Sequence, residues 1–377
     1  MLSFEFRVFG FELFGFEQTY NPGLDYVLGN DVFVNGVAIT SLANPFIRWE
    51  KSELLDIGVD FGMFRNKLQV EAGYFRKNST DILYSNFPVP ATIGVTNLGA
   101  KNSASMISEG IEFNGSFRGN IGSLKYNVGG NFTAFFRNEV TSLGEGGEET
   151  ITGSDILRVG EPFRAYFGYK AIGIFQSINE IANAPTQLGN TITGPGDIRY
   201  ADVNNDGVVN QDDRVVIGNP NPDLLYNFNT SFEYNNFDLN LLFQGVYGVD
   251  RLIQGNGNLP MADDRSNVLT YWLGRWTPEN PSTSLPRVGG QNNTLVSDFY
   301  VQDASYLRLK NIELGYSLPK DVTDKLKISK LRIFVGGQNL LTFTGLENFD
   351  PERGSGAQSN RNAPLYKTVT LGINLKL

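Results

Sequence analysis

The chain ends in a strict alternation of apolar and polar or small residues that runs to its last position. The apolar members of this segment are Val369, Leu371, Ile373, Leu375 and Leu377, and Thr370, Gly372, Asn374 and Lys376 lie between them. The same period of two recurs over residues 55–63. Because successive side chains of a β-strand point to opposite faces, each segment predicts a strand with one apolar and one polar face. Many such strands predict an all-β, transmembrane antiparallel β-barrel.

Composition agrees with strands and turns rather than helices. The 377 residues include 42 glycines, 28 phenylalanines and 16 tyrosines but only 4 methionines. No run of about 18 apolar residues occurs, which excludes a transmembrane helix. A soluble β-sandwich would show the same alternation. We favour the barrel because several predicted strands have ten or more residues, whereas strands of soluble sheets have about five or six.

Charge and residue content narrow the function. The formal net charge of −9, from 31 basic and 40 acidic residues, argues against a nucleic-acid-binding protein, which would carry a basic face. The chain has no histidine and no cysteine, so Ser-His and Cys-His catalysis within it are impossible. We therefore predict no enzymatic activity, although a hydrolase of another type stays an alternative that an activity screen would expose.

Tight turns alternate with long polar segments along the chain. Short turns are predicted at Arg65-Asn66, at Asn235-Asn236 and within residues 119–122, each between two alternating segments. Long, polar, glycine-rich loops are predicted at Thr141–Gly160, Ser177–Asp197, Gly255–Asp264 and Asn280–Asp298. Outer-membrane barrels have this asymmetry of short periplasmic turns and long external loops. We count about ten or eleven strands in total.

One loop has the residue spacing of a calcium site. Oxygen-bearing side chains stand at positions one, three, five, nine and twelve of the loop, with Gly207 at position six and the carbonyl of Val208 at position seven. The predicted ligands are Asp202, Asn204, Asp206, Val208, Asn210 and Asp213. We predict a structural Ca²⁺ ion within an external insertion at residues 196–218. An Asx-rich turn without a metal would have a similar composition.

Four aromatic residues are candidates for contact with a ligand. Trp272, Trp276, Tyr271 and Tyr300 offer ring faces on which a sugar could stack. Aromatic residues of a barrel more often form the girdle at the membrane interface or pack within loops. The sequence therefore does not define a substrate-binding set.

Three groups of motifs, in order along the chain, resemble the C-terminal half of SusC/RagA-type TonB-linked outer-membrane transporters. The first group runs from residues 43–50 into 57–62 and on to 74–77. The second comprises residues 196–200 (GDIRY), 202–207 (DVNNDG), 217–220 (IGNP) and 243–248 (FQGVYG). The third comprises residues 304–311 (ASYLRLKN), 337–340 (GQNL) and 350–352 (DPE). The resemblance covers approximately residues 18–377.

The resemblance implies a fold and a function. Transporters of this family are barrels of about 22 strands around a plugged lumen. They import oligosaccharides, peptides or other bulky nutrients, usually beneath a SusD-like surface lipoprotein, and the TonB complex supplies energy through an N-terminal plug. The implied location is the outer membrane of a Gram-negative bacterium, with its lipid around the barrel.

The beginning of the chain departs from the family pattern. No plug and no TonB-contacting segment is recognisable, and the first 16 residues resemble neither the family's strand nor a signal peptide, because Glu5, Arg7 and Glu12 interrupt their apolar character. We therefore interpret residues 1–377 as the C-terminal portion of such a barrel. The alternative function is a calcium-stabilised cell-surface β-protein that binds glycans without transporting them.

Overall fold

A computed structural model describes residues 19–29, 32–90, 92, 99–188, 193–254, 269–352 and 365–376 of the chain. The first 16 residues and the predicted loop at 255–264 lie outside these ranges. No helix in the described part is long and apolar enough to span a membrane.

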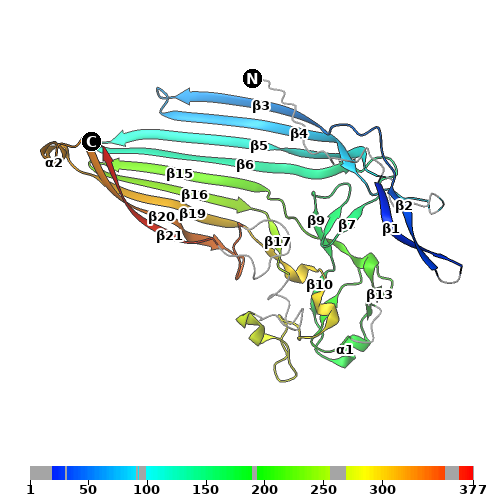
Figure 1. Ribbon diagram of the computed structural model, residues 1–377. Helices are drawn as coiled ribbons and strands as arrows, with labels where there is room; N and C mark the ends of the chain where they lie inside the picture. The colour runs from blue at the N-terminus through cyan, green and yellow to red at the C-terminus, as the bar shows by residue number, and fades with distance from the viewer. Residues whose placement is uncertain are drawn as a thin grey trace.

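A single antiparallel sheet of nine long strands dominates the molecule, with strand order β21-β20-β19-β16-β15-β6-β5-β4-β3 (Figure 1). All of its neighbouring strands are antiparallel. The strands are β3 (Lys51–Met63), β4 (Leu68–Tyr84), β5 (Lys101–Ile121), β6 (Leu124–Ser142), β15 (Leu224–Tyr234), β16 (Phe237–Tyr247), β19 (Tyr306–Ser317), β20 (Lys330–Thr344) and β21 (Thr368–Lys376). The all-β prediction is confirmed. The sheet is open, since β3 and β21 form its two edges in the described part of the chain.

Short connections join the strands at one end of this sheet. The β3–β4 turn contains Arg65 and Asn66, and the β15–β16 turn is Asn235-Asn236, as predicted. Asn66 and Asn235 have φ values of 61° and 52°, a left-handed conformation that asparagine tolerates better than most residues. The β5–β6 prediction was too wide, because β5 continues to Ile121 and only Gly122 and Ser123 form the turn. The short helix α2 (Lys320–Lys325) lies at the same end (Figure 1).

Long segments form a separate lobe at the other end of the sheet (Figure 1). We call the described residues within 143–223 and 248–305 the lobe. Its elements are β7 (Thr150–Thr152), β8 (Asp155–Leu157), β9 (Ala165–Gly168), β10 (Ala171–Ile174), α1 (Ile178–Ala182), β11 (Thr186–Gln187), β12 (Ile198–Tyr200), β13 (Val208–Val209), η2 (Gln211–Asp213), β14 (Val215–Gly218), β17 (Asp250–Leu252), η3 (Thr270–Gly274), η4 (Gln291–Thr294), η5 (Asp298–Tyr300) and β18 (Val301–Asp303). The hairpin of β1 (Thr19–Leu28) and β2 (Val32–Ser41) also lies at this end.

The lobe has the main compact core of the described residues, while the sheet has an exposed apolar face. Tyr166, Ile198, Tyr200, Val209 and Leu252 are at most 1% exposed and pack in one lobe cluster. By contrast, Leu371 and Val369 on β21 are 77% and 71% exposed. Apolar side chains at this exposure destabilise a protein in water and are favourable in lipid. The lobe is therefore suited to water, and the apolar face of the sheet is suited to lipid.

Candidate functional site: the two faces of the sheet

Residues that are paired across the strands share a face of the sheet, so the strand register shows what each face presents. One face carries apolar rows. The row nearest the lobe consists of Ile57, Tyr74, Ile111, Ala134, Leu224 and Tyr247. The row nearest the short turns consists of Ile121, Leu124, Tyr234, Phe237, Tyr316, Ile333 and Ile373. Aromatic residues occur in both rows, as expected of two interfacial girdles.

The distance between these two rows matches a membrane. On β5 they are separated by the ten residue steps from Ile111 to Ile121. At about 3.3 Å per residue the rows are roughly 33 Å apart along the strand, and a tilt of about 40° reduces this to about 25 Å. That value is the height of the apolar band of outer-membrane barrels. The apolar face therefore has the dimensions of a lipid-facing wall.

The opposite face carries polar rows across the same strands. One row crosses eight strands and contains only polar residues: Asp60, Glu71, Asn114, Asn131, Asn227, Gln244, Arg308 and Thr342. Asn227 donates to Asn131 over 3.0 Å, and Asn114 donates to Glu71 over 3.0 Å. These four side chains hydrogen-bond one another across strands and still offer groups to solvent, whereas Arg308 is buried and paired with Asp350. This polar face is the predicted inner face of the barrel wall.

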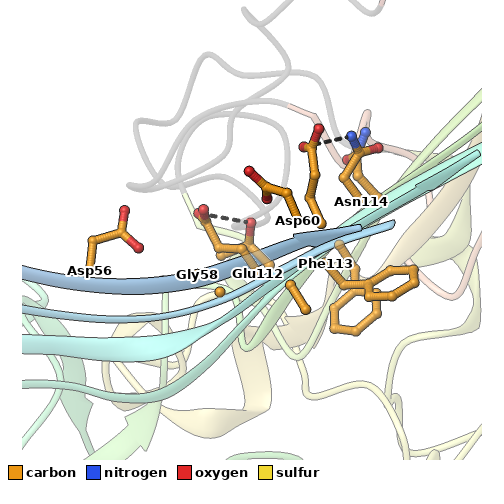
Figure 2. A pocket seen from close by; sticks show the side chains of 12 residues that line it. Asp56, Gly58, Asp60, Glu112, Phe113 and Asn114 are labelled. Atoms are coloured by element: carbon orange, nitrogen blue, oxygen red, sulfur yellow. Dashed lines mark hydrogen bonds between the residues drawn. The ribbon is translucent and has the colours of Figure 1, made fainter. Parts of the chain in front are cut away.

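A hollow of about 520 Å³ lies on the inner face of β3, β4, β5 and β6. Four carboxylates line it, those of Asp56, Asp60, Glu71 and Glu112, and no lysine or arginine does. Figure 2 shows Asp56 and Asp60 on one side of the sheet and the ring of Phe113 on the other. Thr133 donates to Glu112 over 3.4 Å. The hollow thus offers hydrogen-bond acceptors and a negative charge to any solute inside the barrel.

Glycines let the sheet bring polar side chains close together in this hollow. Gly58 and Gly73 are paired across β3 and β4 between the acidic positions. A Cβ at Gly58 would meet only a backbone oxygen at 3.6 Å, so neither strand is crowded there. The absence of side chains at both positions leaves the space that the four carboxylates surround.

The predicted calcium loop folds in the lobe as a set of turns closed by its own side chains. The Asp202 carboxylate accepts from the N–H groups of Asp206 (3.2 Å) and Gly207 (2.8 Å). The Asn204 side chain accepts from the Asp206 N–H at 2.9 Å, and the Asp206 side chain accepts from the Val208 N–H at 2.8 Å. Gly207 has φ +88°, a conformation that favours glycine. Asp202, Asn204 and Asp206 are therefore brought together.

Asp213 is placed differently from the other predicted ligands. It is fully buried, and its carboxylate accepts from the N–H groups of Val203 (2.7 Å), Asn204 (3.3 Å) and Asn210 (2.8 Å). The side chain of Asn210 in turn accepts from the Asp212 N–H at 2.6 Å. Within the described ranges, no group of three or more Asp, Glu, His or Cys residues is positioned to hold a metal. The oxygen donors suit Ca²⁺ chemically, with Asp213 already engaged in closing the loop.

The four candidate aromatic residues have mostly structural positions. Trp272 and Tyr300 are only 1% and 5% exposed, so their ring faces are covered by protein. The Trp276 indole donates to the Gln176 side chain over 3.1 Å, beside the backbone of Gly196. Tyr271 is 36% exposed and remains open to a ligand.

The lobe also contains an ion-pair network around the buried Asp197 that residue patterns did not predict. Arg287 forms two hydrogen bonds to the Asp197 carboxylate, at 2.6 and 2.9 Å, and Asn293 donates to the same carboxylate at 3.0 Å. Asp197 is 2% exposed, and its carboxylate raises the pKa of Arg287. Asp197 belongs to the GDIRY motif, but its partners Arg287 and Asn293 lie about ninety residues further along the chain. No local sequence pattern therefore connects the three residues.

Comparisons with known proteins agree with this geometry. The family described as TonB dependent receptor-like, beta-barrel matches residues 10–340. TonB-dependent receptor P3 of Formosa agariphila is 32% identical over 93% of this chain and 36% of its own length. TonB-dependent receptor SusC of Bacteroides thetaiotaomicron is 25% identical over 88% of this chain and 32% of its own length. The chain thus spans about a third of the length of these curated relatives.

Solved structures show the same fold. The RagAB peptide importer in its open-open state superimposes with a TM-score of 0.75 and 22% identity, over 100% of this chain and 40% of that one. The closed-closed state gives the same TM-score at 21% identity. The resemblance of the motifs to this family is confirmed, and the nine strands correspond to part of a larger barrel. The chain belongs to the TonB-dependent receptor-like β-barrel family.

Proposed function

We propose that this chain forms the C-terminal part of the barrel of a TonB-dependent, SusC-like importer that carries oligosaccharides or peptides across the outer membrane of a Gram-negative bacterium. The observation that carries the proposal is the two-faced sheet. Its apolar face is about one membrane high, and its polar face runs without interruption across eight strands.

The polar face suits the passage of hydrated, uncharged or cationic solutes. Sugar hydroxyls and peptide N–H groups are donors that the carboxylates of Asp60, Glu71 and Glu112 can accept. Side chains spread over many strands give several weak contacts rather than one tight site. A transporter needs such binding because a solute held too tightly would not leave. In this proposal the wall guides the solute and catalyses no reaction.

The proposed partners follow from the family and from the two ends of the sheet. A SusD-like surface lipoprotein would cover the lobe end, where the long segments lie (Figure 1). The TonB complex would act at the end with short turns, through a plug contributed by another part of the full-length protein. The RagAB structures, described as those of a peptide importer, and the named SusC relative support this assignment.

Uptake by cells tests the proposal. Cells that produce the full-length protein with its lipoprotein would be given fluorescent oligosaccharides or fluorescent peptides, in the presence and absence of TonB. We expect TonB-dependent accumulation of one of the two substrate classes. Equal fluorescence in both strains for every substrate would contradict import.

We also propose that a structural Ca²⁺ ion binds the loop of residues 202–213, as part of an external insertion at 196–218. The ligand spacing and the turns that bring Asp202, Asn204 and Asp206 together support this proposal. Asn210, Asp213 and the carbonyl of Val208 would complete the set. The ion would hold the loop beside β11, with which β13 pairs in parallel.

The calcium proposal predicts a metal-dependent melting temperature. We expect the midpoint of thermal unfolding to rise when Ca²⁺ replaces EGTA, and to become insensitive to Ca²⁺ in a variant carrying Asp202→Asn and Asp206→Asn. Asp212→Asn is the matched control, because Asp212 lies in the same loop at a position outside the predicted ligand set. Identical curves with Ca²⁺ and EGTA for the unaltered protein would refute the ion.

A further inference from the structure

The lobe contains a small aromatic pocket where it meets the sheet. The pocket has a volume of about 220 Å³ and lies beside β17, β18 and the segment after β20. At about 30 Å³ for each water molecule, it holds roughly seven waters, or one small chemical group. Five aromatic side chains and one carboxylate are among its lining: Tyr271, Trp272, Phe299, Tyr300, Phe349 and Glu347.

The walls of this pocket are held in place by the surrounding structure. Trp272 and Tyr300 are buried, and the centroids of Tyr271 and Trp272 are 5.4 Å apart. The indole N–H of Trp272 is hydrogen-bonded to the Tyr271 hydroxyl. Phe299 packs edge-on against Tyr300, with centroids 4.9 Å apart. The rings therefore have fixed positions before any ligand arrives.

Glu347 supplies the negative charge of the pocket. Its backbone N–H donates to the Gln302 side chain at 3.4 Å, which anchors this residue to β18, while its own side chain is exposed. Burial raises the pKa of Tyr271, and the nearby charge of Glu347 raises it further. No lysine or arginine is among the lining residues. Anionic groups are therefore disfavoured in this pocket.

The less buried rings of the pocket, Tyr271, Phe299 and Phe349, combined with a carboxylate favour a cation. Ring faces carry a negative potential that attracts ammonium groups, and the attraction strengthens where water is partly excluded. A carboxylate at the rim adds a charge-assisted hydrogen bond. We propose that this pocket binds a protonated amine on the imported substrate. This inference rests on the proposed importer function and adds to it a preference for amine-bearing nutrients.

Two sources could supply the amine, a lysine side chain of a peptide or the amino group of an amino sugar. Binding to the purified full-length protein in detergent, measured by calorimetry, separates them. The probes are the peptide acetyl-Gly-Lys-Gly-amide and a glucosamine trisaccharide, each compared with its uncharged analogue, the norleucine peptide or the N-acetylated trisaccharide. We expect at least one charged probe to bind more tightly than its analogue, and that probe identifies the source.

The variant Glu347→Gln tests whether the pocket is responsible. We expect it to weaken binding of the charged probe by about two- to fivefold, the effect of removing one exposed partner of an ion pair. Glu279→Gln removes an exposed carboxylate elsewhere in the lobe and is expected to leave binding unchanged. Equal binding of charged and uncharged probes, or equal losses in the two variants, would overturn the inference. Because this assay needs no transport, TonB-dependent uptake that persists in either case would leave the importer function standing.

Discussion

At the scale of single residues, the motifs that identify the family form contacts between distant segments. Arg308 of the SYLRLKN motif pairs with Asp350 at 2.9 Å and with Glu352 at 3.3 Å, both from the DPE motif. Lys310 also reaches Glu352, at 3.0 Å. These charges are largely buried, where an unpaired partner would be strongly unfavourable. The two motifs therefore fix the segment after β20 against β19.

The Asp197 network predicts a large loss of stability when it is broken. In Asp197→Ala the Arg287 guanidinium loses its carboxylate partner, and the buried Asn293 amide loses one of its two acceptors and keeps the Arg287 carbonyl. Because Arg287 is about a third exposed, we expect a loss of about 2–3 kcal/mol rather than the 3–5 kcal/mol of a fully buried pair. Equilibrium unfolding measures it. Glu149→Gln, which removes an exposed partner of Arg158, is the control and is expected to cost at most about 1 kcal/mol.

The ion pairs of Asp81 are expected to make the stability of the folded protein depend on pH under acidic conditions. Lys51 at 2.8 Å lowers the pKa of the Asp81 carboxyl, which burial opposes, and Arg48 at 3.3 Å lowers it further. The folded pKa therefore lies below the unfolded value of about 3.9. This contribution to stability is present above the unfolded pKa and is lost as the pH falls through the folded pKa. Thermal melts of Asp81→Asn below about pH 4 are expected to change less with pH than those of the unaltered protein. An unchanged pH dependence would contradict the assignment.

At the scale of strands, neighbouring residues are expected to respond oppositely to the same substitution. Phe228 lies on the apolar face of β15 near the middle of the band, and Asn229 lies on the polar face. An arginine at position 228 would face lipid and is expected to destabilise the barrel by about 2–4 kcal/mol. Asn229→Arg places the same side chain towards water and is the matched control. The heat-modifiable folded fraction in outer membranes reports both. Equal yields for the two variants would contradict the assigned faces.

Strands and tight turns could be predicted from the sequence because their signals are local. The alternation over residues 237–247 and the Asn235-Asn236 turn define a hairpin within about twenty residues. The lobe lacked such signals. Its strands have two to four residues, which is too short for a period of two to be visible. The predicted loop Thr141–Gly160, for example, contains β7 and β8.

In the candidate sites, too, some features follow from local sequence and others depend on tertiary packing. The predicted alternation over residues 55–63 puts Asp56 and Asp60 on the polar face of a strand. The hollow that they form with Glu71 and Glu112 depends on the register of β3, β4 and β5. The ring of Trp272 was a candidate for stacking and is instead buried. It lines one pocket together with Tyr300 and Phe349, which are distant from it in sequence. Burial is a property of tertiary packing that residue spacing does not reveal.

At the scale of the whole molecule, the open sheet explains how this chain relates to its family. The nine sheet strands of the described residues are fewer than the about 22 of the family's barrel, and within those residues β3 and β21 are edge strands with unpaired backbone groups. Such edges are not tolerated in lipid unless they are paired. A closed wall would need further strands beside β3 and β21, and the chain spans about a third of the length of the relatives that it matches.

Cysteine scanning of β15 in the full-length protein tests the central claim, that this sheet is a membrane wall with an inner and an outer face. The chain itself has no cysteine, so single cysteines can be placed at each of residues 225–233 without background from this region. A water-soluble maleimide is expected to label positions 225, 227, 229, 231 and 233, which face the lumen. Positions 226, 228, 230 and 232 are expected to stay unlabelled because lipid covers them. Labelling without a period of two, or solubility of the protein in the absence of detergent, would contradict the account.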